Sequence, residues 1–536
     1  MTFLSGIFFV FLFVTCLLYF IFPLKARWFV LLLSSVIFYL SWGWQALPVV
    51  LVTSLMVYLA ARRIDTIYVK QDEDLKREGM TLAEKKECKL QAKKRAKRVH
   101  MLVSVLVILV LIYTKTGSKI MNSLGSLLGY DVLNAAGELD TSARPAWMTV
   151  IVPLGISYYT FSMVGYLADV YWRKDKAEKN FLKFLTWVLF FPKILQGPIA
   201  RHKKLGAQIN EGHAFDYERV CFGVQLALWG YFKKLVIADR LSIFVNSVFG
   251  NVYGESGSLI FVIAAIFGSI QLYCDFSGCM DMAGGFCQIL GIDLEKNFNH
   301  PFFSKSAAEF WRRWHITLGT WMKDYIFYPF SISKKMLAFG KKAKKIFGKK
   351  TGKILPICAA NLLIFFVVGV WHGAAWKYII YGLYNGLIIA ASNLLKPYYA
   401  KWAAVCHVNT ESRGWKTFQI FRTFILVNIG WLFDACATAT TAFYAMRAVF
   451  INFKISILTD GSLYKLGLVK RDWTILIVAT IILFISSVMK EKGMSLRDFV
   501  AERPLVVRWA VYLILIFATA PFGYVSSSTE FMYAQF

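Results

Sequence analysis

Acidic residues are scarce in this chain of 536 residues, which has 32 Asp and Glu against 61 Lys and Arg and a formal net charge of +29. Charged residues of both signs make up only 17% of the sequence, whereas 57% of it is hydrophobic. Soluble domains cannot bury so much apolar surface, so lipid must cover much of it. This composition excludes a disordered protein, a coiled coil and a secreted disulfide scaffold.

Paired cysteines and the common signatures of soluble enzymes are also missing. The nine cysteines form no C-x-x-C pair and most lie in apolar stretches, so we interpret them as small hydrophobic residues and predict no metal site. The sequence has no dinucleotide-binding fingerprint, no P-loop and no G-x-S-x-G motif. Its basic residues cluster between apolar runs, which indicates membrane topology and predicts no nucleic-acid partner.

Long apolar runs alternate with short basic segments along the chain. The first run reaches Pro23 without the charged front of a signal peptide, so it is predicted to cross the membrane. Similar runs recur and indicate about eleven crossings. Phe181–Leu195 is short and leads into a basic stretch, which favours a re-entrant segment. The predicted fold class is an all-α polytopic protein of the plasma or inner membrane, with re-entrant and amphipathic helices between its spans.

The charge pattern divides the chain into four regions. Lys and Arg predominate in two segments, an arm at about 62–100 and a loop with nine lysines at 334–353, and both are predicted to be cytoplasmic. The four predicted regions are N-terminal membrane helices with the arm (1–115), an extracytoplasmic loop (116–147), a core that includes the Lys-rich loop (148–395), and C-terminal membrane helices (396–536). Membrane lipid is the expected neighbour of the arm.

Histidine is the usual general base, and an ionisable group at membrane depth is costly, so each histidine is a potential functional residue. His372 stands at the end of an apolar run, between Gly369 and Gly373, where another helix can approach closely. It is either a general base or a neutral histidine hydrogen-bonded across helices. The other histidines, apart from His315, are predicted to be solvated (His100, His202, His213, His407) or to lie in a turn (His300).

His315 lies in an aromatic stretch that we predict to form one helix over 310–325. A helical wheel places His315 on an aromatic face with Trp311, Trp314 and Tyr325. Charged side chains gather on the opposite face, where Glu309 and Arg313 are spaced for an i,i+4 ion pair. The aromatic face is either a core contact or part of a site. Two carboxylates six residues apart, Asp275 and Asp281, are predicted to serve in capping and polar packing, or to line a substrate channel.

Six stretches together resemble the membrane-bound O-acyltransferase (MBOAT) family, and within it the bacterial branch of alginate O-acetylation and D-alanyl transfer proteins. They cover the chain from about residue 150 to residue 390 in order. The stretches are 154–161 (LGISYYTF), 191–199 (FPKILQGPI), 275–278 (DFSG), 297–302 (NFNHPF), 310–315 (FWRRWH) and 371–373 (WHG).

The resemblance implies a helix bundle around a central tunnel, with acyl transfer from a cytoplasmic thioester to a hydroxyl acceptor outside. It implies that His372 is catalytic and that His315 is its polar companion. A neutral imidazole can take the hydroxyl proton or receive the acyl group itself, and the sequence leaves both routes open. The residues expected to bind substrate or to line the tunnel are Trp311, Arg312, Trp314, Asp324, Tyr325, Trp371, Gln196, Ser157, Asp275 and Ser277.

The family also implies the reaction partners. Acetyl is the expected acyl group, with acetyl-CoA or an acyl-carrier protein as co-substrate, no bound cofactor, and a polysaccharide as the final acceptor. A separate extracytoplasmic SGNH-type acyltransferase is the expected partner, and a cytoplasmic acyl carrier is a further one. The alternatives are D-alanyl transfer to teichoic acid or, outside the enzymes, a membrane transporter or an assembly scaffold.

Overall fold

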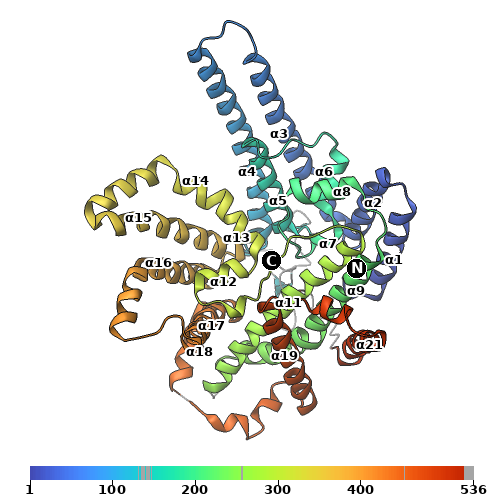
Figure 1. The fold of residues 1–536 in the computed structure, drawn as a ribbon, viewed down its shortest axis with the longest axis vertical. Helices are drawn as coiled ribbons and strands as arrows, with labels where there is room; N and C mark the ends of the chain where they lie inside the picture. The colour runs from blue at the N-terminus through green and yellow to red at the C-terminus, as the bar shows by residue number, and fades with distance from the viewer. Residues whose placement is uncertain are drawn as a thin grey trace. The chain divides into compact units, whose positions relative to one another are not determined.

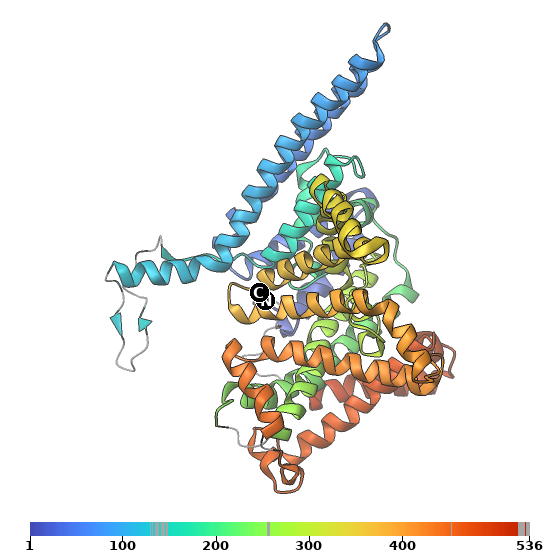
Figure 2. The same ribbon diagram turned by 90° about the vertical axis from the view of Figure 1, so that its left-hand side faces the viewer.

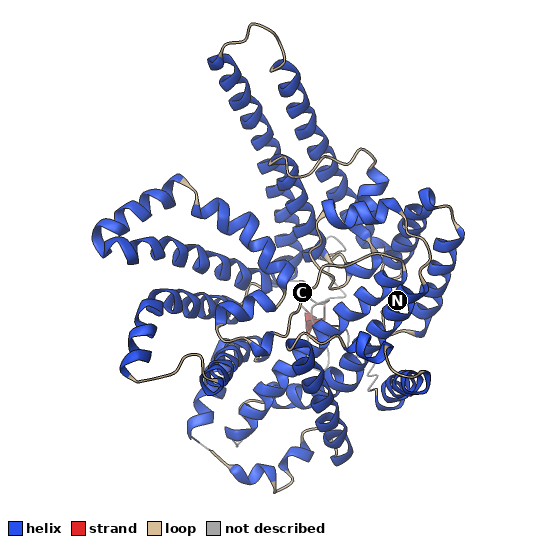
Figure 3. Cartoon of the chain, in the orientation of Figure 1, coloured by secondary structure: helices blue, strands red, loops and turns tan. Residues whose placement is uncertain are grey.

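The computed structural model is helical over almost all of the chain that it describes (Figure 3). It describes every residue except 129, 131, 134–138, 141–144, 146–147, 255–257, 452, 524–530 and 532–536. A two-residue antiparallel pair, β1 (Val132–Leu133) with β2 (Leu139–Asp140), is the β-structure of the described residues. The all-α prediction is confirmed.

The chain divides into two compact units. Unit 1 holds residues 1–220 together with 286–294, and unit 2 holds residues 221–285 and 295–535. The elements of unit 1 are α1 (Gly6–Ile21), η1 (Leu24–Ala26), α2 (Arg27–Leu40), η2 (Trp44–Ala46), α3 (Leu47–Asp74), α4 (Leu82–Leu127), the pair β1 and β2, α5 (Ile156–Tyr171), α6 (Phe181–Leu189), α7 (Phe191–Ile194), η4 (His202–Gly206) and α8 (Ala207–Glu211).

The predicted basic arm of unit 1 is the outer part of a long helical hairpin, with α3 and α4 side by side (Figures 1 and 2). A capping box begins α4, because Thr81 accepts from the N–H of Glu84 while the Glu84 carboxylate accepts from the N–H of Thr81. Ala92 and Ala96 are buried, so the cations between them face outward. The helix α4 runs on to Leu127, so the first part of the predicted extracytoplasmic loop (116–147) is helical, and much of the remainder lies outside the described residues.

Unit 2 carries the helices of the C-terminal half. Two helices, α9 (Tyr217–Tyr231) and α11 (Ser258–Ile289), begin or end in unit 1. The others are η5 (Phe232–Ala238), α10 (Asp239–Gly250), η6 (Pro301–Phe303), α12 (Ala307–Arg313), α13 (Ile316–Met322), η7 (Lys323–Phe327), α14 (Tyr328–Ser331), α15 (Lys334–His372), α16 (Trp376–Val405), α17 (Arg413–Ala435), α18 (Ala439–Ile451), η8 (Ile455–Leu458), η9 (Ser462–Lys465), α19 (Lys470–Glu491), α20 (Leu496–Ala501) and α21 (Leu505–Phe522).

The Lys-rich segment 334–353, predicted as a loop, is helical instead. Gly348 interrupts α15 with a backbone φ of 78°, which a glycine adopts without a Cβ clash. The helix before this break lies against the helix after it, because a Cβ on Gly352 would collide with the backbone of Lys344 and a Cβ on Gly340 would touch Pro356. The lysines are therefore displayed on a helical hairpin rather than on an extended loop.

Seven helices of the described chain are long and apolar enough to cross a membrane. They are α3, α4, the continuous stretch from α9 to α10, α11, α15, α16 and α19. The predicted number, about eleven, also included shorter runs, which form helices such as α1 and α21. The predicted re-entrant segment 181–195 is broken into α6 and α7, and at about 1.5 Å per residue neither is long enough to cross a bilayer.

The helices α15 and α16 approach closely along their length. A Cβ on Gly382 would collide with the carbonyl oxygen of Phe365, and one on Gly369 would meet the carbonyl oxygen of Tyr378. Such small residues let membrane helices pack backbone against backbone. This contact holds the C-terminal end of α15, where His372 lies, against the start of α16.

Gly382→Ala should therefore force α15 and α16 apart and destabilise unit 2 by about 1–3 kcal/mol, the usual cost of overpacking. Thermal unfolding of the purified protein in detergent measures this. Gly414→Ala, in α17, is the matched control, because a Cβ there meets no atom within 4 Å. Equal unfolding temperatures for the two variants would contradict the proposed close contact.

Candidate functional site

His315 lies at a break between two helices and not within one. The helix α12 ends at Arg313, Trp314 is extended, and α13 begins at Ile316. His315 itself has a left-handed backbone, with φ 45° and ψ 54°, which is uncommon for a residue with a side chain. The single helix predicted over 310–325 is therefore wrong, although the predicted ion pair of Arg313 with Glu309 is present at 2.8 Å.

Pairing with a distant segment causes this break. The N–H of Asn299 donates to the carbonyl oxygen of Arg313 at 2.9 Å, and the N–H of Ile316 donates to that of Asn297 at 3.0 Å. Those two bonds take backbone groups that a continuous helix would use itself. A helical wheel drawn over 310–325 does not predict these hydrogen bonds, because their partners lie outside that stretch.

His315 and His372 belong to one aromatic cluster of unit 2. The His315 ring packs edge-on against Phe276 at 4.8 Å between centroids and lies 6.2 Å from Trp371. The Trp371 ring is in turn 4.9 Å from that of His372. The structure thus brings the two predicted histidines together around Trp371, and both are buried, with His315 3% and His372 7% exposed.

His372 is the last residue of α15, and two tyrosines of α16 flank its ring. The Tyr378 ring stacks beside it at 6.0 Å, and Tyr381 meets it edge-on at 5.5 Å. Because the chain turns at Gly373, the N-terminal turns of α16 return alongside His372. The imidazole is consequently held on several sides by rings.

Burial lowers the pKa of His315 to about 3, and charge on His372 would lower it further. His315 is therefore neutral at physiological pH. A neutral imidazole has one N–H donor and one bare nitrogen, so it can accept a proton or a hydrogen bond.

The other predicted site residues of this segment have different environments. The Trp311 Nε1–H donates to the Asn385 side-chain oxygen of α16 at 3.1 Å. Trp314 is buried, Arg312 is exposed, and Asp324 lies in η7 at intermediate burial. The Tyr325 ring contacts that of Trp321 at 5.2 Å. In the described structure Trp311 thus connects its helix to α16, and Trp314 is part of the packed interior.

Asp275 and Ser277, predicted as tunnel residues, are bound by two buried lysines that the sequence analysis did not single out. The Lys234 ammonium lies 2.6 Å from Asp275 and 2.7 Å from Asp239. The neighbouring Lys233 donates to Ser277 at 2.8 Å, and it also pairs with Asp281, again at 2.8 Å. Two adjacent lysines within an apolar run are a signal that would have located this network, since intramembrane charges need partners.

Ser157 and Gln196 lie in unit 1, whereas the other predicted site residues lie in unit 2. Both are buried, at 2% and 0% exposed. Their two stretches meet, because a Cβ on Gly155, whose φ is 66°, would collide with the carbonyl oxygen of Ile194. Next to this contact, the buried Lys193 ammonium lies 4.4 Å above the Trp187 ring.

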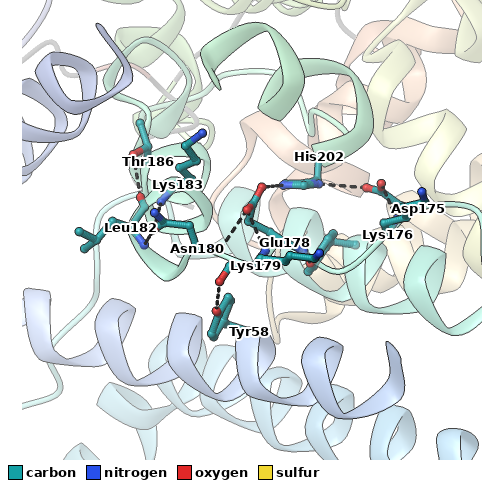
Figure 4. A network of polar contacts seen from close by, with 11 residues as sticks. Tyr58, Asp175, Lys176, Glu178, Lys179, Asn180, Leu182, Lys183, Thr186 and His202 are labelled. Atoms are coloured by element: carbon teal, nitrogen blue, oxygen red, sulfur yellow. Dashed lines mark hydrogen bonds and ion pairs between the residues drawn. The ribbon is translucent and has the colours of Figure 1, made fainter. Parts of the chain in front are cut away.

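His202, predicted to be solvated, is mostly buried in unit 1, and that prediction is wrong. Its Nδ1 is 3.0 Å from the Asp175 carboxylate, and its Nε2 is 4.0 Å from that of Glu178 (Figure 4). The rings of Tyr166 and Trp187 cover it at 4.7 and 5.3 Å. This network ties the start of η4 to the turn that follows α5. The prediction of a turn at His300 is confirmed, since its φ is 44° immediately before η6.

The described residues contain no group of three or more His, Cys, Asp or Glu placed to hold a metal ion. The nine cysteines are all unpaired, and five of them are buried.

An all-helical membrane protein with two buried histidines around one tryptophan is the class that fold and site define. Residues 173–429 match the model of MBOAT, the membrane-bound O-acyltransferase family. The chain therefore carries an MBOAT domain, and the resemblance found in the sequence is confirmed.

Three curated relatives show how far the similarity extends. A probable alginate O-acetylase of Pseudomonas syringae is 33% identical over 57% of this chain and 53% of the relative. A peptidoglycan O-acetyltransferase of Helicobacter pylori is 29% identical over 56% and 57% of the two chains. A teichoic acid D-alanyltransferase of Bacillus subtilis is 31% identical over 46% and 60%. The chain thus spans little more than half the length of these relatives.

The buried His315 should make stability depend on pH. Its pKa of about 3 lies below the ordinary value of 6.5, so the folded protein binds fewer protons than the unfolded chain between these values. Stability should therefore be complete above about pH 6.5 and fall by about 1.4 kcal/mol per pH unit below it. Thermal unfolding at several pH values measures this loss. His315→Gln should reduce it, and the exposed His407→Gln should not; identical pH dependence in both variants would contradict the assignment.

Proposed function

We propose that the protein is a membrane O-acyltransferase whose reaction takes place at His372. The observation that carries the proposal is the buried pair of histidines around Trp371 within an MBOAT domain. In one route the imidazole accepts the proton of an acceptor hydroxyl while that oxygen attacks a thioester carbonyl, and the thiolate leaves and is protonated. In the other route the bare imidazole nitrogen attacks the thioester carbonyl, and the thiolate leaves and takes up the proton that the acylated ring releases. The hydroxyl oxygen then attacks the acyl group, and the departing imidazole takes up the hydroxyl proton.

Acetyl is the group that the relatives favour. Relatives from Pseudomonas syringae and Pseudomonas aeruginosa are named as probable alginate O-acetylases, and the relative from Helicobacter pylori is named as a peptidoglycan O-acetyltransferase. We therefore propose acetylation of an extracytoplasmic or cell-wall polysaccharide. D-alanyl transfer is the second candidate, supported by the similarity to teichoic acid D-alanyltransferases of Bacillus subtilis and Lacticaseibacillus rhamnosus.

The proposed donor is a cytoplasmic thioester, acetyl-CoA or an acyl-carrier protein. Both donors are anionic, and the helical hairpin of α15 displays nine lysines without an acid between Lys334 and Lys353. In this proposal the protein lies in the plasma or inner membrane. It passes the acyl group to a separate SGNH-type transferase outside the membrane.

His372→Ala should abolish acyl transfer without unfolding the protein, because the imidazole is proposed to make or break bonds while the aromatic rings around it remain. Mass spectrometry of envelope polymers from cells carrying the variant would show the missing ester, acetyl or D-alanyl. His407→Ala is the matched control, since His407 is exposed. Retained acylation in a folded His372→Ala protein would favour the transporter or the scaffold.

Electrostatic capture of the donor should appear as a salt dependence. The KM for acetyl-CoA should rise as ionic strength increases, because exposed charges are screened beyond about 10 Å at 0.1 M salt. Substituting Lys341, Lys342, Lys344 and Lys345 by glutamine should raise KM at low salt and flatten this dependence, with little change in kcat. A donor KM that stays constant from low to high salt would contradict the capture.

A further inference from the structure

Asn297 is buried beside His315, and two groups of Thr317 determine the orientation of its side chain. Asn297 is 2% exposed. Its Oδ1 accepts from the Thr317 N–H at 3.0 Å and from the Thr317 hydroxyl at 2.7 Å. A backbone N–H can only donate, so the atom that faces it must be the amide oxygen and not the nitrogen.

The other end of the Asn297 amide agrees with this assignment. Its Nδ2 lies 3.2 Å from the sulfur of Met280, which can only accept a hydrogen bond. The backbone carbonyl of Asn297 accepts from Ile316, so the same residue is anchored at both its backbone and its side chain. The amide therefore has a single orientation relative to His315.

The third group at the Asn297 oxygen is the imidazole. His315 Nδ1 lies 3.4 Å from Asn297 Oδ1. Because this oxygen accepts only, the interaction is favourable only when Nδ1 carries a hydrogen. In a neutral imidazole, the hydrogen on Nδ1 leaves Nε2 bare.

We propose that Asn297 is a positioning residue that holds His315 as the neutral Nδ1–H tautomer. The bare Nε2 of His315 can then accept a hydrogen bond from the hydroxyl acceptor, while the proposed proton or acyl transfer takes place at His372. The proposal rests on the proposed acyl transfer for its catalytic meaning. The position of the hydrogen on His315 can be tested even if the protein transfers no acyl group.

An amide in this place, rather than a carboxylate, serves the neutral form. A carboxylate would stabilise an imidazolium, and an imidazolium has no bare nitrogen. Two rings that pack against His315, those of Phe276 in α11 and Trp371 in α15, are uncharged. His372 is the titratable group that acts on His315, and its charge would oppose a second one.

The tautomer can be observed directly. In protein labelled with 15N-histidine, the ring signals of His315 are identified as those lost in His315→Gln. At neutral pH the wild-type spectrum should show a protonated Nδ1 and a bare Nε2, and Asn297→Ala should move part of the hydrogen to Nε2. A wild-type ring with hydrogen on Nε2, or a charged ring, would overturn the proposal. So would an unchanged tautomer in Asn297→Ala.

Asn297→Asp provides the second test, because it keeps the size of the side chain and should fold. The new carboxylate should raise the pH at which His315 becomes charged, seen in the same 15N signals. Below that pH, acyl transfer should fall by about tenfold per pH unit relative to the wild type. Asn299→Asp is the matched control, since Asn299 is exposed and only two residues away.

The two readouts separate this proposal from the proposed function. If the 15N signals shift as expected but no variant or wild-type protein transfers an acyl group, the acyl-transfer assignment fails and the tautomer assignment holds. If Asn297→Asp leaves both the ring signals and the pH profile as in Asn299→Asp, Asn297 does not position His315.

Discussion

Two backbone hydrogen bonds, from Asn299 to Arg313 and from Ile316 to Asn297, are the constraint on which the histidine site depends. They occupy groups that would otherwise continue α12 into α13, so the chain opens at this point. His315 takes up the change of direction with its left-handed backbone. Its ring is thereby directed toward the rings of α11 and α15, where burial keeps it neutral.

A buried ion pair in α11 lies next to the histidine site. Asp275, held by Lys234, immediately precedes Phe276, whose ring packs against His315. Removing one member of such a pair leaves an unpaired buried charge, which costs about 3–5 kcal/mol. The lysines and aspartates of α11 and η5 therefore position the aromatic wall of the site, besides satisfying each other in an apolar surrounding.

The close approach of α15 and α16 connects this wall to His372. Gly369 and Gly382 bring the two backbones into contact, and Tyr378 and Tyr381 of α16 then flank the imidazole. The site is thus built from contacts between several helices, and each contact has its own physical cause. Small residues allow the approach, paired charges satisfy the buried polar groups, and rings fill the space between them.

Local patterns were enough to predict the membrane helices, the Glu309–Arg313 pair and both histidines as residues to examine. They were not enough where a partner outside the pattern competes: the aromatic wheel predicted one helix through His315, and the basic neighbours of His202 suggested solvent where Asp175 and Trp187 enclose it. Lys233 and Lys234 within an apolar run indicate buried partners, but the identity of those partners, such as Asp239 and Asp275, depends on the packing of two separate elements.

Composition alone showed that lipid surrounds much of the chain, because an apolar majority with few charged residues cannot be buried in a soluble protein. The ordered motifs indicated the MBOAT domain that residues 173–429 match. Which polar groups contact one another depended on the folded chain. Hydropathy and helical periodicity describe how a segment faces its surroundings, whereas the break at His315 and its contact with Asn297 depend on hydrogen bonds between segments. Those bonds exist only after the chain has folded.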